Sequence, residues 1–300
     1  MSNRNDTTDF HAIASAIEAR GFCVVPDFLG RDEIDFLVEE FDVCPDYSAP
    51  PQDKRSAGLR GDQPATGALR ENAMGRKETY QRIRPRMEAF AQGVTGAKAA
   101  LYQILYLQTP ITDLPVHQDT DQFFLTAFNP THLNFWIPLV KPSRTEAGLR
   151  LIPWDRLGEQ SPRLLNLCRH SGASFMRSLR DGGTWYVSDW SGVHWVDEDL
   201  ELEEVIETPE LGPGDLLLLS HNTVHTTQTT DDRRLAVSLR TCDPETPIDW
   251  HRVVGSPTPH RMSHLAGRSR LNFPVFQHIQ ANDFGATLGD LVPTLTGERE

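Results

Sequence analysis

Two segments that lie far apart in the chain contain residues that could together bind a metal ion and a carboxylate. The first holds His117 and Asp119, separated by Gln118. In the second, a Gly-Asp turn leads into a leucine-rich run that ends at His225, and Arg234 follows. Imidazole and carboxylate ligands suit Fe(II) and other divalent first-row metals, and a guanidinium matches a carboxylate bidentately. If the two segments meet in space, they predict an open iron site beside an anionic co-substrate.

The spacing within each segment supports this interpretation. His117 and Asp119 are two positions apart, so an extended backbone would point both side chains to one face. A His-x-Asp triplet is weak evidence by itself, because such triplets arise often by chance. In the second segment Arg234, Ser238 and Arg240 share one face of a predicted strand, while leucine and valine take the other face. A barrel presents polar side chains inward and packs apolar ones outward in this way.

The elements that would position these residues fall into an N-terminal helical group and a later group of strands. Helices are predicted at residues 8–20, 32–41 and 78–93, with a strand at 22–25 and a long loop at 44–67. Short strands are predicted at residues 101–107, 133–139, 148–152, 184–187, 205–208, 215–220 and 235–241. This order predicts an α+β chain with a mainly β core of the sandwich or barrel kind.

Length and composition bound the organisation and the partners. We expect residues 1–300 to form a single domain, with a helical part at about 8–95, a β core at about 99–245 and a C-terminal extension at 246–300. The formal net charge of −13 argues against nucleic acid and membrane surfaces as partners, since both need basic protein surfaces. The polar N-terminus and four scattered cysteines predict a cytoplasmic protein with reduced thiols and no membrane span.

Four stretches, taken in order, resemble the phytanoyl-CoA dioxygenase family of Fe(II)/2-oxoglutarate oxygenases. They are the His117–Asp119 triplet, residues 135–139 with 148–153, residues 214–225, and Arg234-Leu235-Ala236. The N-terminal strand and its following Pro-Asp-Phe-Leu turn also fit, so the resemblance covers roughly residues 10–245. It implies a double-stranded β-helix (a jelly-roll, cupin-like fold) with flanking N-terminal helices.

The resemblance also implies a ligand set and a reaction. His117, Asp119 and His225 would bind Fe(II), and Arg234 would bind the distal carboxylate of 2-oxoglutarate. Such enzymes use O2 to convert 2-oxoglutarate to succinate and CO2 while they oxidise a small-molecule substrate, usually by hydroxylation. Halogenating relatives lack the carboxylate ligand, so Asp119 favours oxygenation.

Four further residues are candidates for binding the co-substrate. Relatives often place a polar residue where Gln103 stands. Asn134 could donate to the other carboxylate of the oxo acid, and Ser238 could share the distal carboxylate with Arg234. Trp136 shares a strand face with Asn134. Each also has an ordinary alternative role, such as a strand-edge amide for Gln103 or a core side chain for Trp136.

Two other histidines could be metal ligands, and two segments differ from the family pattern. His221 and His194 could compete as ligands, although a structural or pocket-lining role explains both. Trp154-Asp155-Arg156 replaces the family's Gly-Ser-His, and residues 226–228 replace the small pair after the distal histidine. These loops shape the pocket, so the substrate class stays open.

Two other functions also stay open. One is a metal-dependent barrel enzyme that needs no 2-oxoglutarate, such as an isomerase or another dioxygenase. The other is a catalytically silent metal-binding barrel, which the intact ligand set disfavours. A small molecule is the expected substrate, and the sequence makes no prediction of oligomeric state.

Overall fold

The computed structural model describes the chain in several ranges. They are residues 8–43, 69–71, 77–108, 116, 118, 129–170, 174–177, 185–189, 192–196, 200–228, 230, 232–247 and 287–290. His117 and Asp119 lie outside these ranges, and the side chains of Gln103 and His194 are likewise not described. Within the described ranges, no helix combines the length and the apolar character needed to cross a membrane.

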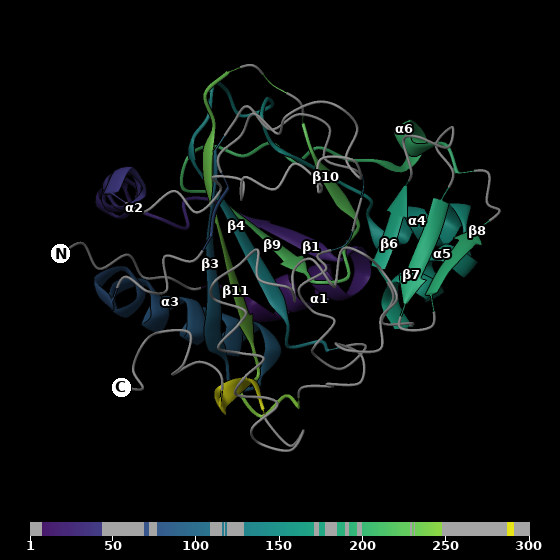
Figure 1. The fold of residues 1–300 in the computed structure, drawn as a ribbon, viewed down its shortest axis with the longest axis horizontal. Helices are drawn as coiled ribbons and strands as arrows, with labels where there is room; N and C mark the ends of the chain where they lie inside the picture. Colours follow the sequence, from purple (N-terminus) through teal and green to yellow (C-terminus); the bar gives the residue numbers. More distant parts are fainter. Residues whose placement is uncertain are drawn as a thin grey trace, which may run out of the picture.

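Among the described residues, six strands form one antiparallel sheet in the order β1-β9-β4-β11-β3-β2 (Figure 1). They are β1 (Phe22–Val25), β9 (Leu216–Ser220), β4 (Leu133–Val140), β11 (Leu235–Cys242), β3 (Ala100–Gln108) and β2 (Leu69–Glu71). The smaller antiparallel sheets are β10 (His225–Thr227) with β5 (Leu149–Leu151), and β6 (Ser174–Arg177), β7 (Trp185–Asp189) and β8 (Gly192–Val196).

The described helices flank these sheets. They are α1 (Phe10–Arg20), α2 (Arg31–Val43), α3 (Lys77–Thr95), α4 (Trp154–Gln160), α5 (Pro162–His170) and α6 (Leu202–Val205). The three N-terminal helices and the antiparallel core confirm the predicted α+β class. The strand prediction at 205–208 is wrong: Val205 ends α6, and Glu207 only forms an isolated bridge with Leu151.

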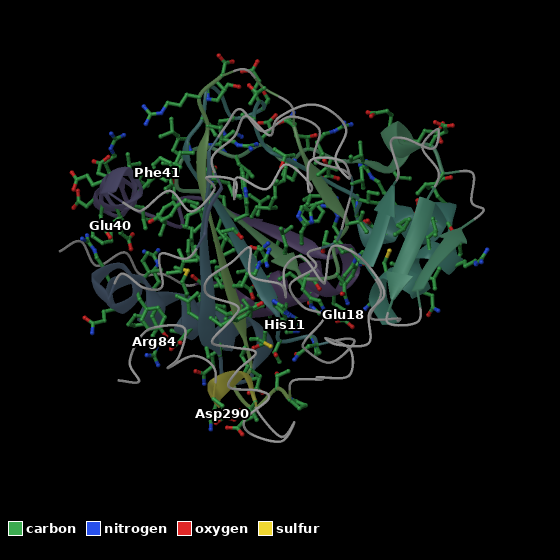
Figure 2. All side chains as sticks on the ribbon, viewed as in Figure 1. His11, Glu18, Glu40, Phe41, Arg84 and Asp290 are labelled. Carbon is green, nitrogen blue, oxygen red and sulfur yellow. The ribbon has the colours of Figure 1, made fainter. Side chains whose placement is uncertain are left out.

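One face of the six-stranded sheet is apolar and carries α1, α2 and α3. Alternate residues of β11, such as Val237 and Leu239, pack there in one buried cluster with residues from all three helices. Phe41 of α2 (labelled in Figure 2) lies edge-on to Tyr106 of β3, with ring centroids 5.7 Å apart. Burying one such large apolar side chain contributes roughly 1.5–3 kcal/mol, so this face supplies much of the stability.

The opposite face, here called the inner face, mixes apolar and polar side chains. Trp136 of β4, Leu217 of β9 and Ala236 of β11 form a second buried cluster with Leu149 and Leu151 of β5. The β10–β5 pair therefore covers part of this face, and Figure 1 shows β10 on the side of the sheet away from α2 and α3. The alternation predicted for residues 234–240 is confirmed, because the leucines and valine face the helices.

A glycine sets the close approach between the end of α1 and the turn before His225. Gly21 caps α1 in the left-handed region, with φ of 83°. A Cβ there would lie 2.6 Å from Thr223 Oγ1 and 2.8 Å from the Trp154 ring. The Thr223 hydroxyl donates to the Gly21 carbonyl at 2.6 Å. A side chain at position 21 would therefore push the turn at residues 221–224 away from the sheet.

The described residues between positions 154 and 205, here called the insert, lie between β5 and β9 in the chain, and the sequence predicted them poorly. It begins where the family's Gly-Ser-His was expected, and there Trp154 starts α4 with its ring buried against Gly21 and beneath the Arg169 guanidinium. Its described helices share a separate apolar cluster that includes Leu157 and Leu164. The insert thus packs around an apolar cluster that is distinct from the two clusters on the main sheet.

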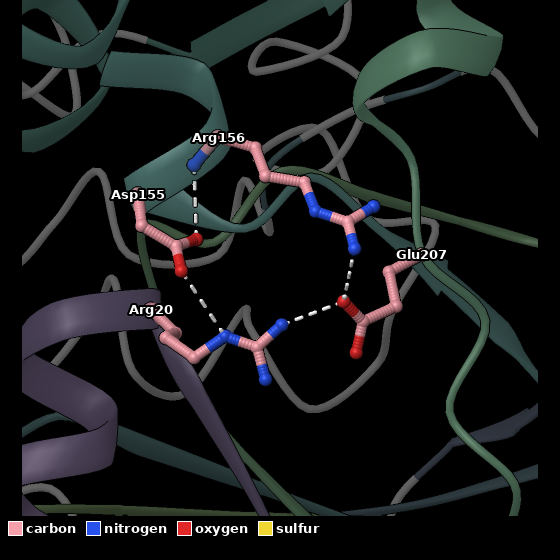
Figure 3. A network of polar contacts seen from close by, with 4 residues as sticks. All are labelled: Arg20, Asp155, Arg156 and Glu207. Atoms are coloured by element: carbon pink, nitrogen blue, oxygen red, sulfur yellow. Dashed lines mark hydrogen bonds and ion pairs between the residues drawn. The ribbon is translucent and has the colours of Figure 1, made fainter. Parts of the chain in front are cut away.

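A network of charged side chains ties this insert to α1 (Figure 3). Arg20 lies 2.6 Å from a carboxylate oxygen of Glu207 and 3.4 Å from one of Asp155. Arg156 lies 3.4 Å from the same Glu207 oxygen. These side chains are partly exposed, so each pair contributes at most about 1 kcal/mol. The network fixes the direction of α4 more than it adds stability.

Candidate functional site

Arg234 is buried at the entry to β11, on the inner face. Its side chain is 1% exposed, and Nη1 donates to the carbonyl of Ala147 at 3.3 Å. Burial lowers the pKa of Arg234 to about 10, which still leaves the guanidinium charged at neutral pH. Ala147 adopts a left-handed conformation with φ of 55°, which is uncommon for a residue with a Cβ. This turn aims a carbonyl at the guanidinium and helps to fix its position.

Polar side chains continue along the inner face of β11 and β4. Ser238 is opposite Trp136 in the register, and Arg240 is opposite both Asn134 and Gln103. The Ser238 hydroxyl donates to Asn134 Oδ1 at 2.7 Å. The structure thus brings the predicted residues Asn134, Trp136 and Ser238 together, and it places the backbone of Gln103 in the same row.

Trp136 presents a polar atom within this buried face. Its side chain is 2% exposed, and among the described residues nothing accepts a hydrogen bond from its indole Nε1. A buried donor without an acceptor costs about 1–3 kcal/mol, so it is usually explained by a water or ligand. The indole N–H therefore suits an anionic or carbonyl oxygen bound on the inner face.

His225 begins β10 and is oriented by its own turn. It pairs with Leu151 of β5, and Nδ1 lies 2.9 Å from the carbonyl of Thr223. A carbonyl can only accept, so Nδ1 carries the proton and Nε2 of the neutral ring keeps its lone pair. Metal-binding histidines are commonly fixed in this way by a backbone carbonyl. The local structure thus prepares His225 to act as a ligand through Nε2.

The other two predicted ligands lie outside the described residues, but their neighbours are described. Gln118 is buried and donates to the carbonyl of Asn222 at 2.6 Å, three residues before His225. Val116 packs in the same cluster as Val224. The residues that flank His117 are therefore in contact with those that precede His225. Among the described side chains, a set without His117 and Asp119, no three potential ligands cluster.

A buried histidine pair stands near the end of the polar row. His221, a rival ligand in the sequence analysis, stacks on His132 with ring centroids 4.7 Å apart and planes at 20°. His132 also hydrogen-bonds the Tyr102 hydroxyl. Burial lowers the pKa of His132 well below its usual value, and His221 and Arg240 lower it further. His132 was missed from the sequence, although it lies two residues before Asn134 and extends that strand's alternation.

Lys141, also missed from the sequence, follows β4 near Arg234. Its ammonium donates to the carbonyl of Arg144 at 3.1 Å. Burial lowers the pKa of Lys141 to about 8, and the neighbouring charges of Arg234 and Arg144 add to this effect. Asp215 and Glu146 act in the opposite direction on the pKa of Lys141, but burial and the two arginines outweigh them.

Gln228 is one of the residues 226–228 that replace the family's small pair after His225, and it has a structural role. Its side-chain oxygen accepts from the Gly148 backbone N–H at 2.6 Å, and its backbone N–H donates to the Gly148 carbonyl at 3.0 Å. The residue thus extends the pairing of β10 with β5 and anchors the turn that holds Ala147.

Solved structures were compared with this chain, and one of them, with a TM-score above 0.5, shares its fold. The non-heme alpha ketoglutarate dependent carbocyclase SnoK from nogalamycin biosynthesis is 14% identical, with a TM-score of 0.51 over 85% of this chain and 90% of that one. EctD from S. alaskensis, solved with 2-oxoglutarate and 5-hydroxyectoine, is 15% identical, with a TM-score of 0.49 over 83% and 78%. Curated protein sequences give no match.

Comparison with protein-family models places the chain in the class of non-haem iron, 2-oxoglutarate-dependent oxygenases. The matching model is described as phytanoyl-CoA dioxygenase (PhyH) and spans residues 17–236. The chain belongs to this family, as its ordered motifs predicted.

Proposed function

We propose that the protein is an Fe(II)- and 2-oxoglutarate-dependent dioxygenase that hydroxylates a small-molecule substrate. His117, Asp119 and His225 bind the iron, and Arg234 binds the distal carboxylate of 2-oxoglutarate. The described sheets belong to a double-stranded β-helix within a single domain at residues 1–300. One O2 and one 2-oxoglutarate are consumed for each hydroxylated product, and succinate and CO2 are released.

The observation that carries this proposal is the buried cation at the end of a polar row on the inner face. The Arg234 guanidinium is 1% exposed, and the Ala147 carbonyl helps to fix its position on the inner face. A carboxylate is the group that a guanidinium binds in bidentate geometry. The adjacent Lys141 adds attraction for an anion. These features suit a dicarboxylic co-substrate.

The described residues also fit the iron and the second end of the oxo acid. At His225 the Thr223 carbonyl accepts a hydrogen bond from Nδ1, so Nε2 is the nitrogen that would bind the iron. Trp136 Nε1 and the Asn134 amide lie on the same face as Arg234 and supply donors for carbonyl or carboxylate oxygens. Bound iron would supply the redox chemistry with O2. The protein residues orient the oxo acid and exclude water from it.

Succinate release tests the proposal directly. Protein loaded anaerobically with Fe(II) should release succinate from 2-oxoglutarate after O2 is admitted, and more of it when a panel of small molecules contains a substrate. Failure to bind both Fe(II) and 2-oxoglutarate would overturn the proposal. Metal binding without O2 consumption across a broad panel would instead support a silent barrel.

Arg234→Ala separates the proposal from a metal enzyme that needs no oxo acid. The variant should weaken 2-oxoglutarate binding at least tenfold, because a buried charge-assisted pair is lost. The exposed neighbour Arg233 provides the matched control, since Arg233→Ala removes the same charge one residue away. Unchanged turnover in a folded Arg234→Ala protein would favour the isomerase or other dioxygenase.

A further inference from the structure

Gln118 joins three segments through one buried amide. Its side chain is 2% exposed, and Nε2 donates to the carbonyl of Cys168 at 3.0 Å and to that of Asn222 at 2.6 Å. Both partners are carbonyl oxygens, which can only accept, so the amide orientation is fixed by chemistry. The residue between the two predicted ligands 117 and 119 is thereby connected to α5 and to the turn before His225.

The end of α5 accepts from both ligand segments. The last carbonyls of a helix lack partners within the helix and need donors from elsewhere. Gln118 supplies one for Cys168, and Asn222 Nδ2 donates to the Arg169 carbonyl at 3.3 Å. We call these two side chains and the two α5 carbonyls the amide bridge. It holds one residue from each predicted ligand segment against the same helix end.

Apolar contacts reinforce the amide bridge. Val116 precedes His117, and Val224 precedes His225. Both valines are buried in the cluster built on Leu157 of α4 and Leu164 of α5. Each ligand segment therefore contributes one amide and one valine to the insert, whose core is separate from that of the main sheet.

We propose that Gln118 is a positioning residue that, through the amide bridge, sets the spacing between the two iron-ligand segments. This inference rests on the proposed function. Because Gln118 stands between positions 117 and 119 in the sequence, fixing its amide against α5 restrains the chain on both sides of it. The insert then acts as the rigid support for the metal site.

The expected size of the effect follows from the chemistry of metal sites. Residues that orient metal ligands without touching the metal typically change its affinity by roughly 10–100-fold when they are replaced. Gln118→Leu keeps a similar volume and removes both donors. It also leaves two buried carbonyls without this partner, so some loss of stability accompanies it. The experiment must therefore separate metal affinity from stability.

Asn129 offers a matched control for that separation. It is another buried amide, and it donates to Thr246 Oγ1 at 2.8 Å and to Cys242 Sγ at 3.3 Å, neither of which belongs to α5. We would compare wild type, Gln118→Leu and Asn129→Leu in three anaerobic measurements. They are the Fe(II) dissociation constant, the visible charge-transfer absorption of the protein with Fe(II) and 2-oxoglutarate, and the thermal midpoint without metal.

Both variants should be destabilised, but only Gln118→Leu should bind Fe(II) roughly 10–100-fold more weakly and shift the absorption band. Gln118→Asn keeps an amide and should fall between, and it replaces Gln118→Leu in the comparison if the latter does not fold. Wild-type affinity and spectrum in both Gln118 variants would overturn the positioning role and leave the proposed function standing. A wild-type protein that binds neither Fe(II) nor 2-oxoglutarate would overturn both.

Discussion

The two ends of the candidate site are supported by different parts of the molecule. The Arg234 end is built from the six-stranded sheet and from the turn that carries Ala147. The His225 end is held by the insert, through Gln118 and the carbonyls of α5. Co-substrate binding should therefore follow the integrity of the sheet, whereas metal binding should depend on a segment outside that sheet.

The largest effects are expected from two matched core substitutions, one in the insert and one in the sheet. Leu164 in the insert and Leu239 in β11 are both buried, in separate clusters. Either change to alanine should lower the free energy of unfolding by about 2–5 kcal/mol, because each leaves a cavity. Only Leu164→Ala should also weaken Fe(II) binding, since its cluster contains Val116 and Val224.

Chemical denaturation gives the stability of these two variants, and anaerobic Fe(II) titration gives their metal affinity. Measurements under conditions where both proteins remain folded make the affinities comparable. Equal weakening of Fe(II) binding by Leu239→Ala would show that the two ends are not separately supported.

The next largest effect is expected at Asp215, which belongs to the sheet end. Its buried carboxylate accepts from the backbone N–H groups of Gly212 at 2.7 Å and Asp27 at 2.9 Å, and it pairs with Arg144 at 2.8 Å. Asp215→Ala leaves these donors without their acceptor and should cost about 1–3 kcal/mol. Thermal and chemical unfolding measure this loss.

Asp215→Asn is the milder change at this position, because it keeps the side-chain shape and one acceptor oxygen. It should cost less than Asp215→Ala, and both variants should bind Fe(II) with wild-type affinity. A large loss of metal affinity in Asp215→Asn would mean that the sheet end also controls the ligand geometry.

The sheet end could be predicted from the sequence and most of the insert could not. The alternation of Arg234, Ser238 and Arg240 with leucine and valine is a local pattern with period two, so it identified a strand and its two faces. The order of the motifs then identified the family. Neither signal predicts the contact between Gln118 and α5, because that contact joins residues 50 positions apart.

Part of the insert did carry a signal that was overlooked. Trp154, Leu157, Leu164 and Cys168 are spaced near the helical period, and all four are buried in α4 and α5. This period begins at the position where the family's Gly-Ser-His is replaced. At residues 205–208 the opposite error occurred: β-branched residues suggested a strand where Val205 ends a short helix and packs in the apolar cluster of the insert.

The stability of the fold in acid should depend on His132, which lies near the polar row. Its pKa in the folded protein is well below the usual value, so below about pH 6.5 the unfolded chain binds the proton more readily. Folding stability should therefore fall as the pH is lowered from 7 to 5. His132→Gln should reduce this slope, while the same change at the exposed His11 should leave it as in wild type.

Unfolding free energies at several pH values across this range test the prediction. If His132→Gln unfolds with the same pH dependence as wild type, other groups account for the acid sensitivity. The effect should be smaller than those of the core substitutions, because one titrating group contributes while the packing stays in place.

The smallest effect is expected at Lys141, which lies near Arg234 at the sheet end of the site. The pKa of Lys141 is about 8 in the folded protein against 10.5 for an ordinary lysine, so between these values the unfolded chain binds more protons. Wild type should gain stability as the pH rises through this window, and Lys141→Met should lack the gain. The effect is small because Lys141 is only half-buried, and Lys98→Met at an exposed position is the control.

An anion at Arg234 should reverse this shift. The negative charge of 2-oxoglutarate would stabilise the ammonium of Lys141, so binding near pH 8.5 should take up part of a proton, whereas Lys141→Met should bind without that uptake. Calorimetry in two buffers with different ionisation enthalpies measures the difference. Uptake that persists in Lys141→Met would assign the proton to another group. Uptake lost in Lys141→Met but kept in Gln118→Leu would show that the charge of the sheet end acts independently of the amide bridge.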